Sequence, residues 1–269
     1  MSAIGVFDSG YGGLTVLKSL MAKLPQHDFI YYGDNGRAPY GERSFEEVYD
    51  FTLDATKKLF DLGCPLVILA CNTASAKALR TIQQKYLPLY EPNKRVLGVI
   101  RPSAEVVGEL SKTHHIGLLA TEGTVRSNSY KLELEKFSPH IELFQLACPK
   151  WVPLIEEDLV YSEFGKAQIQ KDVNTLLARS PQIDTIILAC THYPIIEDLI
   201  RSVVPQEIQL VAQGEIVAQS LVDYLERHPD MNEKIAKNAT VTYYTSGDSE
   251  LFDRQAKKFM NLETHSKFL

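Results

Sequence analysis

The chain has 269 residues, with 28 Lys and Arg against 34 Asp and Glu, and a formal net charge of −6. Such a balance gives no basic footprint for nucleic acid, and none is expected as a partner. Hydrophobic residues make up 45% and charged residues 23%, which is ordinary for a folded globular enzyme and excludes a disordered chain. Cys64, Cys71, Cys148 and Cys190 are too few and too scattered for a disulfide scaffold, and they form no Cys-x-x-Cys zinc signature.

The N-terminal segment, residues 1–8, has neither a basic start nor an apolar leader and runs directly into an expected strand. No apolar run approaches the roughly 18 residues of a membrane-spanning helix. We therefore expect a cytoplasmic chain without a membrane partner, in a reducing compartment where thiols stay free.

Strand and helix signals alternate through the first hundred residues. The helix after Ser44 is expected to start with a capping box, Ser44 with Glu47, and to end at Gly63. Gly-rich or Pro-rich loops are expected at 8–13 and 35–43. The sequence predicts strands at 4–7, 29–32, 67–70 and 96–100, helices from Leu14 to Met21, from Phe45 to Leu62 and at 73–86, and a loop at 88–93.

The alternation restarts after Arg101-Pro102-Ser103, which we interpret as a crossing into a second domain. The last segment, from Ile208 onward, has no counterpart in the first half, and we expect it to pack back on the first domain. After the crossing, the sequence predicts strands at 116–120, 141–146, 184–189, 208–211 and 240–244, and helical segments at 124–137, 152–159, 163–179, 194–202, 215–227 and 250–260.

Two short stretches resemble each other: an apolar run ending in Ala70-Cys71 and another ending in Ala189-Cys190. Apolar runs of this kind are typical of strands covered on both faces in a parallel sheet. Two fainter matches, in the same order and with nearly the same separation, indicate an internal duplication. We expect two pseudo-symmetric three-layer α/β domains with mainly parallel sheets and the active site between them. The expected domains are 1–98 plus 209–269, and 99–208.

Ligands of open α/β sheets bind beyond the carboxyl ends of the strands, where both Ala-Cys pairs are expected. Cys71 is followed by Asn72 and Thr73 at an expected helix start, a position that lowers a thiol pKa. Cys190 is followed by Thr191 and His192. A single buried cysteine is more often an inert small hydrophobe, but the paired occurrence favours a functional role. Cys64 and Cys148 lack the pattern and are interpreted as structural or incidental.

The loop that begins Asp8-Ser9-Gly10 offers backbone N–H groups at a helix start, which suit a carboxylate. The loop lacks the signature of a P-loop and that of a dinucleotide-binding loop. A turn chosen only for tight strand–helix packing stays an alternative. Asp8 follows a strand and is a candidate site residue, whereas Glu156 could equally be a solvated surface carboxylate.

Several motifs together resemble glutamate racemases, members of the cofactor-independent aspartate/glutamate racemase superfamily. The resemblance runs from Ile4 to about Met260. It rests on Asp8-Ser9-Gly10, Gly33-Asp34, Pro39-Tyr40-Gly41, Ala70-Cys71-Asn72-Thr73 and Cys190-Thr191-His192-Tyr193-Pro194. Many relatives carry a sequence such as Asp-Ser-Gly where this chain has Ala212-Gln213-Gly214, so the role of that loop stays open.

The resemblance implies an isomerase that converts L-glutamate and D-glutamate into each other with no cofactor and no metal, and that supplies D-glutamate for peptidoglycan. By resemblance, Cys71 and Cys190 are the two acid/base groups, with Asp8 helping Cys71 and with Glu156 and His192 helping Cys190. A cytoplasmic homodimer is expected. The implied substrate-binding residues are Asp8, Ser9, Pro39, Tyr40, Gly41, Asn72, Thr73, Thr121, Thr124, Thr191 and His192.

Three other interpretations remain open at this point. Aspartate and hydantoin racemases share the two-cysteine logic, although Asn72-Thr73 and Thr191-His192 favour glutamate. A binding protein could close two domains over a small dicarboxylate with both thiols as spectators. A thiol redox enzyme would require Cys71 and Cys190 to bond across a gap of substrate size, which disulfide geometry disfavours.

Overall fold

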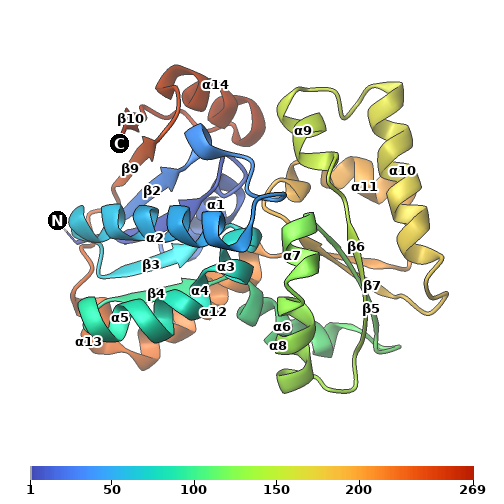
Figure 1. Cartoon of the computed structure of the whole chain (residues 1–269), viewed down its shortest axis with the longest axis horizontal. Helices are drawn as coiled ribbons and strands as arrows, with labels where there is room; N and C mark the ends of the chain where they lie inside the picture. The colour runs from blue at the N-terminus through green and yellow to red at the C-terminus, as the bar shows by residue number, and fades with distance from the viewer. Residues whose placement is uncertain (1) are drawn as a thin grey trace.

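The computed structural model describes residues 2–269 and shows two all-parallel sheets in two halves that lie side by side (Figure 1). The first sheet has the strand order β10-β9-β2-β1-β3-β4, and the second has the order β6-β5-β7-β8. The first sheet contains β1 (Ile4–Asp8), β2 (Phe29–Gly33), β3 (Leu66–Leu69), β4 (Arg95–Gly98), β9 (Val241–Thr245) and β10 (Lys267–Phe268). The second contains β5 (His115–Ala120), β6 (Glu142–Ala147), β7 (Thr185–Ala189) and β8 (Gln209–Ala212).

The two sheets repeat one topology, because β2-β1-β3-β4 and β6-β5-β7-β8 follow the same order. The expected fold class, two pseudo-symmetric α/β units with parallel sheets, is confirmed. The segment from Ile208 onward was expected to have no counterpart in the first half, and for its first strand this expectation was wrong. Strand β8 pairs with β7 as β4 pairs with β3. Residues 209–212 therefore belong to the second sheet, and we propose a domain boundary after residue 212 instead of before residue 209.

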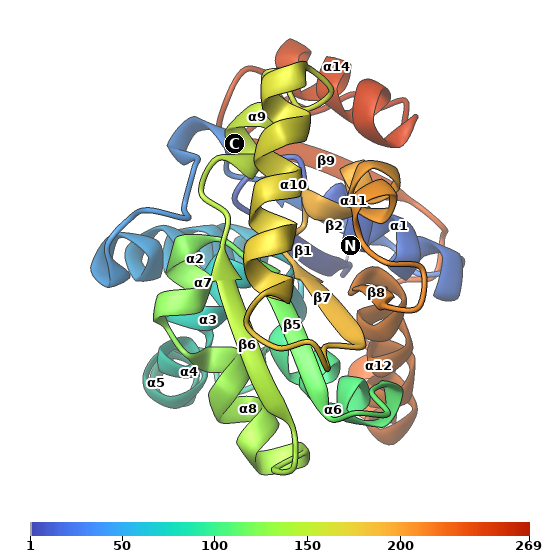
Figure 2. The same ribbon diagram turned by 90° about the vertical axis from the view of Figure 1, so that its right-hand side faces the viewer.

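Helices cover both faces of each sheet, so each half has three layers (Figures 1 and 2). Apart from the helices that cross between the halves, the first half carries α1 (Leu14–Lys23), α2 (Phe45–Asp61), α3 (Asn72–Lys77), α4 (Leu79–Thr81), α5 (Leu87–Tyr90), α13 (Pro229–Glu233) and α14 (Ser249–Met260). The second half carries α7 (Glu122–Arg126), α8 (Ser129–Phe137), α9 (Trp151–Glu156), α10 (Glu163–Leu177) and α11 (Glu197–Val203). Within residues 2–269, no helix is both long and apolar enough to cross a membrane.

Two helices cross between the halves. Helix α6 (Ile100–Leu110) follows β4 of the first sheet, yet Ile100, Ala104 and Val107 pack into the core of the second. Helix α12 (Gly214–Arg227) follows β8 of the second sheet, and its apolar face packs against α1 of the first half. The two crossing helices also contact each other. The strand expected at 96–100 ends at Gly98, because α6 begins at Ile100. The crossing expected at residues 101–103 lies within α6 and is therefore helical.

Other differences from the predicted elements have local causes. The helix expected over 124–137 is broken because Asn128 adopts a left-handed conformation (φ 53°), which starts α8 in a new direction. Pro88 was placed in a loop but lies in α5, which continues directly from the π-helical turn at Ile82–Tyr86. The single helix expected over 73–86 is divided into three parts. Helix α3 ends at Lys77, α4 follows, and a π-helical turn (Ile82–Tyr86) completes the segment.

The predicted capping box at the start of α2 is present. The Ser44 side chain accepts a hydrogen bond from the Glu47 N–H (3.1 Å), and the Glu47 carboxylate accepts one from the Ser44 N–H (3.0 Å). Ser44→Ala removes the first of these bonds. We expect it to lower the free energy of unfolding by about 1 kcal/mol in urea titrations. Thr175→Ala, at an exposed hydroxyl inside α10, serves as a control. Equal loss in both variants would contradict a specific capping effect.

Candidate active site

A cavity lies where the loops at the carboxyl ends of both sheets meet. Its walls come from the loops after β1, β3, β5, β6 and β7 and from the segment after β2. This is the edge at which parallel α/β sheets place ligands. The cavity is lined by Ser9, Gly10, Ala38, Pro39, Tyr40, Gly41, Glu42, Cys71, Thr73, Thr121, Glu122, Cys148, Pro149, Val152, Pro153, Glu156, Cys190, Thr191 and His192.

The structure brings most of the sequence-predicted site residues to this cavity. Its lining includes Ser9, Pro39, Tyr40, Gly41, Cys71, Thr73, Thr121, Glu156, Cys190, Thr191 and His192. Three predicted residues lie just outside the lining. Asp8 is fully buried and accepts hydrogen bonds from the Gly10 N–H (3.0 Å) and the Thr191 hydroxyl (3.2 Å). The Thr124 hydroxyl lies 3.1 Å from that of Thr121. The side chain of Asn72 is bonded away from the cavity, to Gln213 and Tyr130.

Cys71 is the N-cap of helix α3. Its Sγ accepts a hydrogen bond from the Ala74 N–H (3.5 Å) and lies 3.4 Å from the Ser9 hydroxyl. Burial and the nearby Asp8 carboxylate together raise the pKa of the Cys71 thiol to about 12. The hydrogen bond at the helix start lowers this pKa, as expected, but burial and Asp8 exceed that effect, so the expected net lowering is wrong. At neutral pH Cys71 is therefore a neutral thiol, able to donate a proton.

Cys190 comes directly after β7 and is flanked by a charged pair. His192 Nε2 lies 2.9 Å from Glu156 Oε1, and His192 is buried. Burial by itself would lower the pKa of His192. Hydrogen bonds to Cys190 and Glu156 outweigh that effect and raise it to about 10. A protonated His192 therefore stands beside Cys190 at neutral pH, in contrast to the carboxylate beside Cys71.

Asp8 connects these two environments. Burial raises the pKa of the Asp8 carboxyl, and the positive charge of His192 opposes that rise. Thr191, the neighbour of Cys190, donates to the same carboxylate. The charge of the Asp8 carboxylate therefore acts on both sides of the cavity: on the Cys71 thiol, and on His192 beside Cys190.

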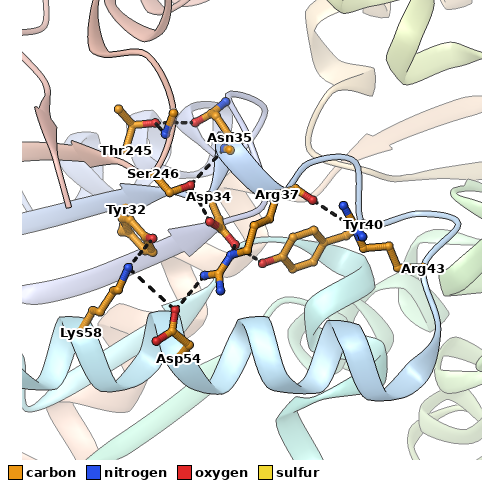
Figure 3. A network of polar contacts seen from close by, with 12 residues as sticks. Tyr32, Asp34, Asn35, Arg37, Tyr40, Arg43, Asp54, Lys58, Thr245 and Ser246 are labelled. Carbon is orange, nitrogen blue, oxygen red and sulfur yellow. Dashed lines mark hydrogen bonds and ion pairs between the residues drawn. The ribbon is translucent and has the colours of Figure 1, made fainter.

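Buried Asp34 holds the cavity-lining segment around Tyr40 in place (Figure 3). Its carboxylate accepts hydrogen bonds from the Arg37 Nε (2.7 Å), the Ser246 hydroxyl (2.6 Å) and the Tyr40 hydroxyl. Arg37 also pairs with Asp54 of α2 (2.9 Å). The bond between Asp34 and Ser246 thus fixes the loop after β2 against the C-terminal part of the chain, and the pair of Arg37 with Asp54 fixes it against α2.

The two halves also bond to each other at the cavity. The Thr73 and Thr121 hydroxyls lie 2.9 Å apart, and the Gly123 N–H donates to the Gly41 carbonyl (2.7 Å). A Cβ at Gly123 would lie 2.8 Å from the same carbonyl oxygen, closer than side chains normally approach. Only glycine allows the second half to approach the Tyr40-Gly41 segment this closely.

Sequence reasoning missed part of the lining. The residues not predicted are Gly10, Ala38, Glu42, Glu122, Cys148, Pro149, Val152 and Pro153. Cys148 was interpreted as structural or incidental, yet it lines the cavity. A signal was present, because Cys148 directly follows β6 and so lies at the same sheet edge as Cys190. Across residues 2–269, no three His, Cys, Asp or Glu side chains are placed to hold a metal ion.

The family model described as Asp/Glu/Hydantoin racemase matches residues 14–221. The chain belongs to this racemase family. It is 40% identical to a glutamate racemase of Dinoroseobacter shibae, covering 96% of this chain and 95% of the relative. It is 38% identical to a glutamate racemase of Bacillus cereus, covering 96% and 92%.

Solved structures agree with the fold of the racemase family. A glutamate racemase isoform from Bacillus anthracis superposes with a TM-score of 0.90 at 30% identity, covering 100% of this chain and 97% of that one. The glutamate racemase of Francisella tularensis in complex with D-glutamate gives 0.86 at 31% identity, with the same coverage.

The raised pKa of Cys71 predicts its reactivity. Only the thiolate is alkylated, so the iodoacetamide rate at Cys71 is expected to rise about tenfold per pH unit between pH 7 and 10. Asp8→Asn removes a charge that raises this pKa, and we expect it to speed alkylation at pH 8 about 3- to 10-fold. Peptide mass spectrometry reads each cysteine separately, and buried Cys64 reports unfolding. An unchanged or slower Cys71 rate in Asp8→Asn, with Cys64 still protected, would contradict this account.

Proposed function

We propose that this chain interconverts L-glutamate and D-glutamate by moving a proton at Cα, with Cys71 and Cys190 as the two acid/base groups. One observation carries the proposal: the two thiols follow β3 and β7, the corresponding strands of the two halves, and both line one cavity. Inversion at a tetrahedral carbon needs one group on each face. A duplicated fold supplies such a pair.

The proton balance of the reaction is simple. One cysteine, as a thiolate, removes the α-proton and becomes a thiol, which leaves an electron pair at Cα. The other cysteine, as a thiol, gives its proton to the opposite face and becomes a thiolate. Each turnover therefore exchanges the protonation states of Cys71 and Cys190, and the reverse reaction restores them. The neutral Cys71 thiol of the unliganded site suits the role of acid in one direction.

Proton transfer by a positioned side chain typically contributes about 10²–10⁴-fold, so the surroundings must supply the rest of the acceleration. We propose that His192, held by Glu156, stabilises the Cys190 thiolate, and that Asp8 acts on the Cys71 side. N–H groups at the start of α3, next to Cys71, are suited to hold the substrate carboxylate. The proposed substrate-binding set is Asp8, Ser9, Pro39, Tyr40, Gly41, Asn72, Thr73, Thr121, Thr124, Thr191 and His192.

Glutamate is proposed as the substrate because the relatives at about 40% identity are named glutamate racemases and one solved neighbour binds D-glutamate. We propose further that no cofactor takes part, that the chain acts as a cytoplasmic homodimer, and that its D-glutamate serves peptidoglycan synthesis. Light scattering of the purified chain tests the dimer.

Proton NMR of pure L-glutamate and of pure D-glutamate in D₂O tests the function, with dialysed protein and no added cofactor. The proposal predicts loss of the α-proton signal together with formation of the other enantiomer, from either starting material. Exchange with aspartate but not glutamate would overturn the substrate assignment. Binding of glutamate without exchange would favour a binding protein.

Substitution of either proposed acid/base group tests their roles. We expect Cys71→Ser and Cys190→Ser each to lower kcat by at least about 10²-fold while binding of glutamate, measured by calorimetry, is retained. Cys148→Ala is the matched control, because Cys148 lines the same cavity but has no proposed chemical role. Wild-type turnover in either serine variant, or an equal loss in Cys148→Ala, would contradict the two-thiol mechanism.

A further inference from the structure

A closed ring of hydrogen bonds joins Gln213 to the residue that follows Cys71. Asn72 Nδ2 donates to Gln213 Oε1 (2.6 Å), Gln213 Nε2 donates to the Tyr130 hydroxyl (2.6 Å), and that hydroxyl donates to Asn72 Oδ1 (2.7 Å). All three residues are buried. Each of the three residues donates one hydrogen bond to the next and accepts one from the previous, so all three bonds run in the same direction around the ring.

The ring is tied to the helices that cross between the halves. Gln213 is the N-cap of α12, and its Nε2 also donates to Ser103 Oγ of α6 (2.7 Å). Ser103 in turn donates to the carbonyl of Val99, the N-cap of α6 (2.9 Å). One side chain thus connects the starts of both crossing helices with the first turn of α3, whose N-cap is Cys71.

The pseudo-symmetry of the fold shows that this support exists on one side only. In the duplicated topology, α6 follows β4 as α12 follows β8, so Val99 is the counterpart of Gln213. A valine side chain has no group that could hold the residue after Cys190. Thr191, which follows Cys190, is instead bonded to Asp8 and Thr15, and His192 is bonded to Glu156. The two thiols therefore have different supports.

We propose that Gln213 is a positioning residue for Cys71 in the proposed racemase reaction. Gln213 fixes Asn72, the first residue of α3. Because Cys71 directly precedes Asn72 as the N-cap of α3, Gln213 thereby sets the direction of the Cys71 side chain. The inference rests on the proposed function for its kinetic consequence. Its structural part, control of Cys71 by Gln213, is tested without any substrate.

Gln213→Met keeps the length of the side chain but removes every hydrogen bond from it. Asn72 and Tyr130 are then left with unsatisfied buried groups and must rearrange, which moves the start of α3. Displacement of a reacting group by about 1 Å can cost about 10²-fold in rate, so we expect kcat/KM to fall about 10- to 100-fold. Gln219→Met makes the same chemical change at an exposed position of α12 and is the matched control.

The substrate-free test is alkylation by iodoacetamide, with each cysteine followed by peptide mass spectrometry. We expect Gln213→Met to change the Cys71 rate at least about threefold while Cys190 keeps its wild-type rate, and Gln219→Met to change neither. Buried Cys64 reports loss of the fold. If Gln213→Met unfolds, Tyr130→Phe, which breaks two bonds of the ring, takes its place. Equal changes at Cys71 and Cys190, or none at Cys71, would overturn the proposal.

The kinetic test uses α-deuterated L-glutamate and D-glutamate separately. One enantiomer loses its deuteron to Cys71, and the other loses it to Cys190. Slower transfer at Cys71 alone makes the isotope effect on kcat/KM rise for the first enantiomer and fall for the second. His192→Asn disturbs the Cys190 side and is expected to reverse this pattern. Parallel shifts for both enantiomers in Gln213→Met would overturn the assignment to Cys71, whereas no turnover by the wild type would overturn the proposed function instead.

Discussion

The crossing of α6 and α12 is the constraint on which the rest of the structure depends. Each helix starts at the carboxyl edge of one sheet and buries its apolar face in the core of the other half. Neither half can complete its helical layers without a helix that follows a strand of its partner. The carboxyl edges of both sheets are consequently held facing one cavity, and so are the loops that carry Cys71 and Cys190.

Duplication gives two similar positions, but the surroundings make the two thiols chemically different. Cys71 is beside a buried carboxylate, and its pKa is raised. Cys190 is beside a histidine whose pKa is also raised, which keeps that ring positively charged. The negative neighbour favours the neutral thiol form of Cys71. In the proposed mechanism one cysteine takes the α-proton while the other gives up its own, and the neutral thiol of Cys71 suits the role of the acid in one direction.

Much of this architecture follows from local sequence signals. The Ala-Cys pairs after apolar runs identified both strands that carry the thiols, and the Ser44 capping box marked the start of α2. Helix α6 was missed because Pro102 after a strand resembles a linker, and only packing against the second sheet shows that this residue lies in the first turn of α6. Helix α12 was expected at 215–227, but not as a crossing between the halves. The contacts of Asn72 and the raised pKa of Cys71 depend on burial by distant segments. Residue spacing carries no information about such burial.

The central claim is that two separate thiols act on the two faces of Cα, and circular dichroism of the reaction in D₂O tests it most directly. Starting from unlabelled L-glutamate, the product leaves with a deuteron from solvent and returns slowly because of its isotope effect. The optical signal should therefore overshoot zero before it decays, and pure D-glutamate should give the mirror-image overshoot. A monotonic approach to zero from both enantiomers, with a primary isotope effect present, would contradict the account and indicate one base serving both faces.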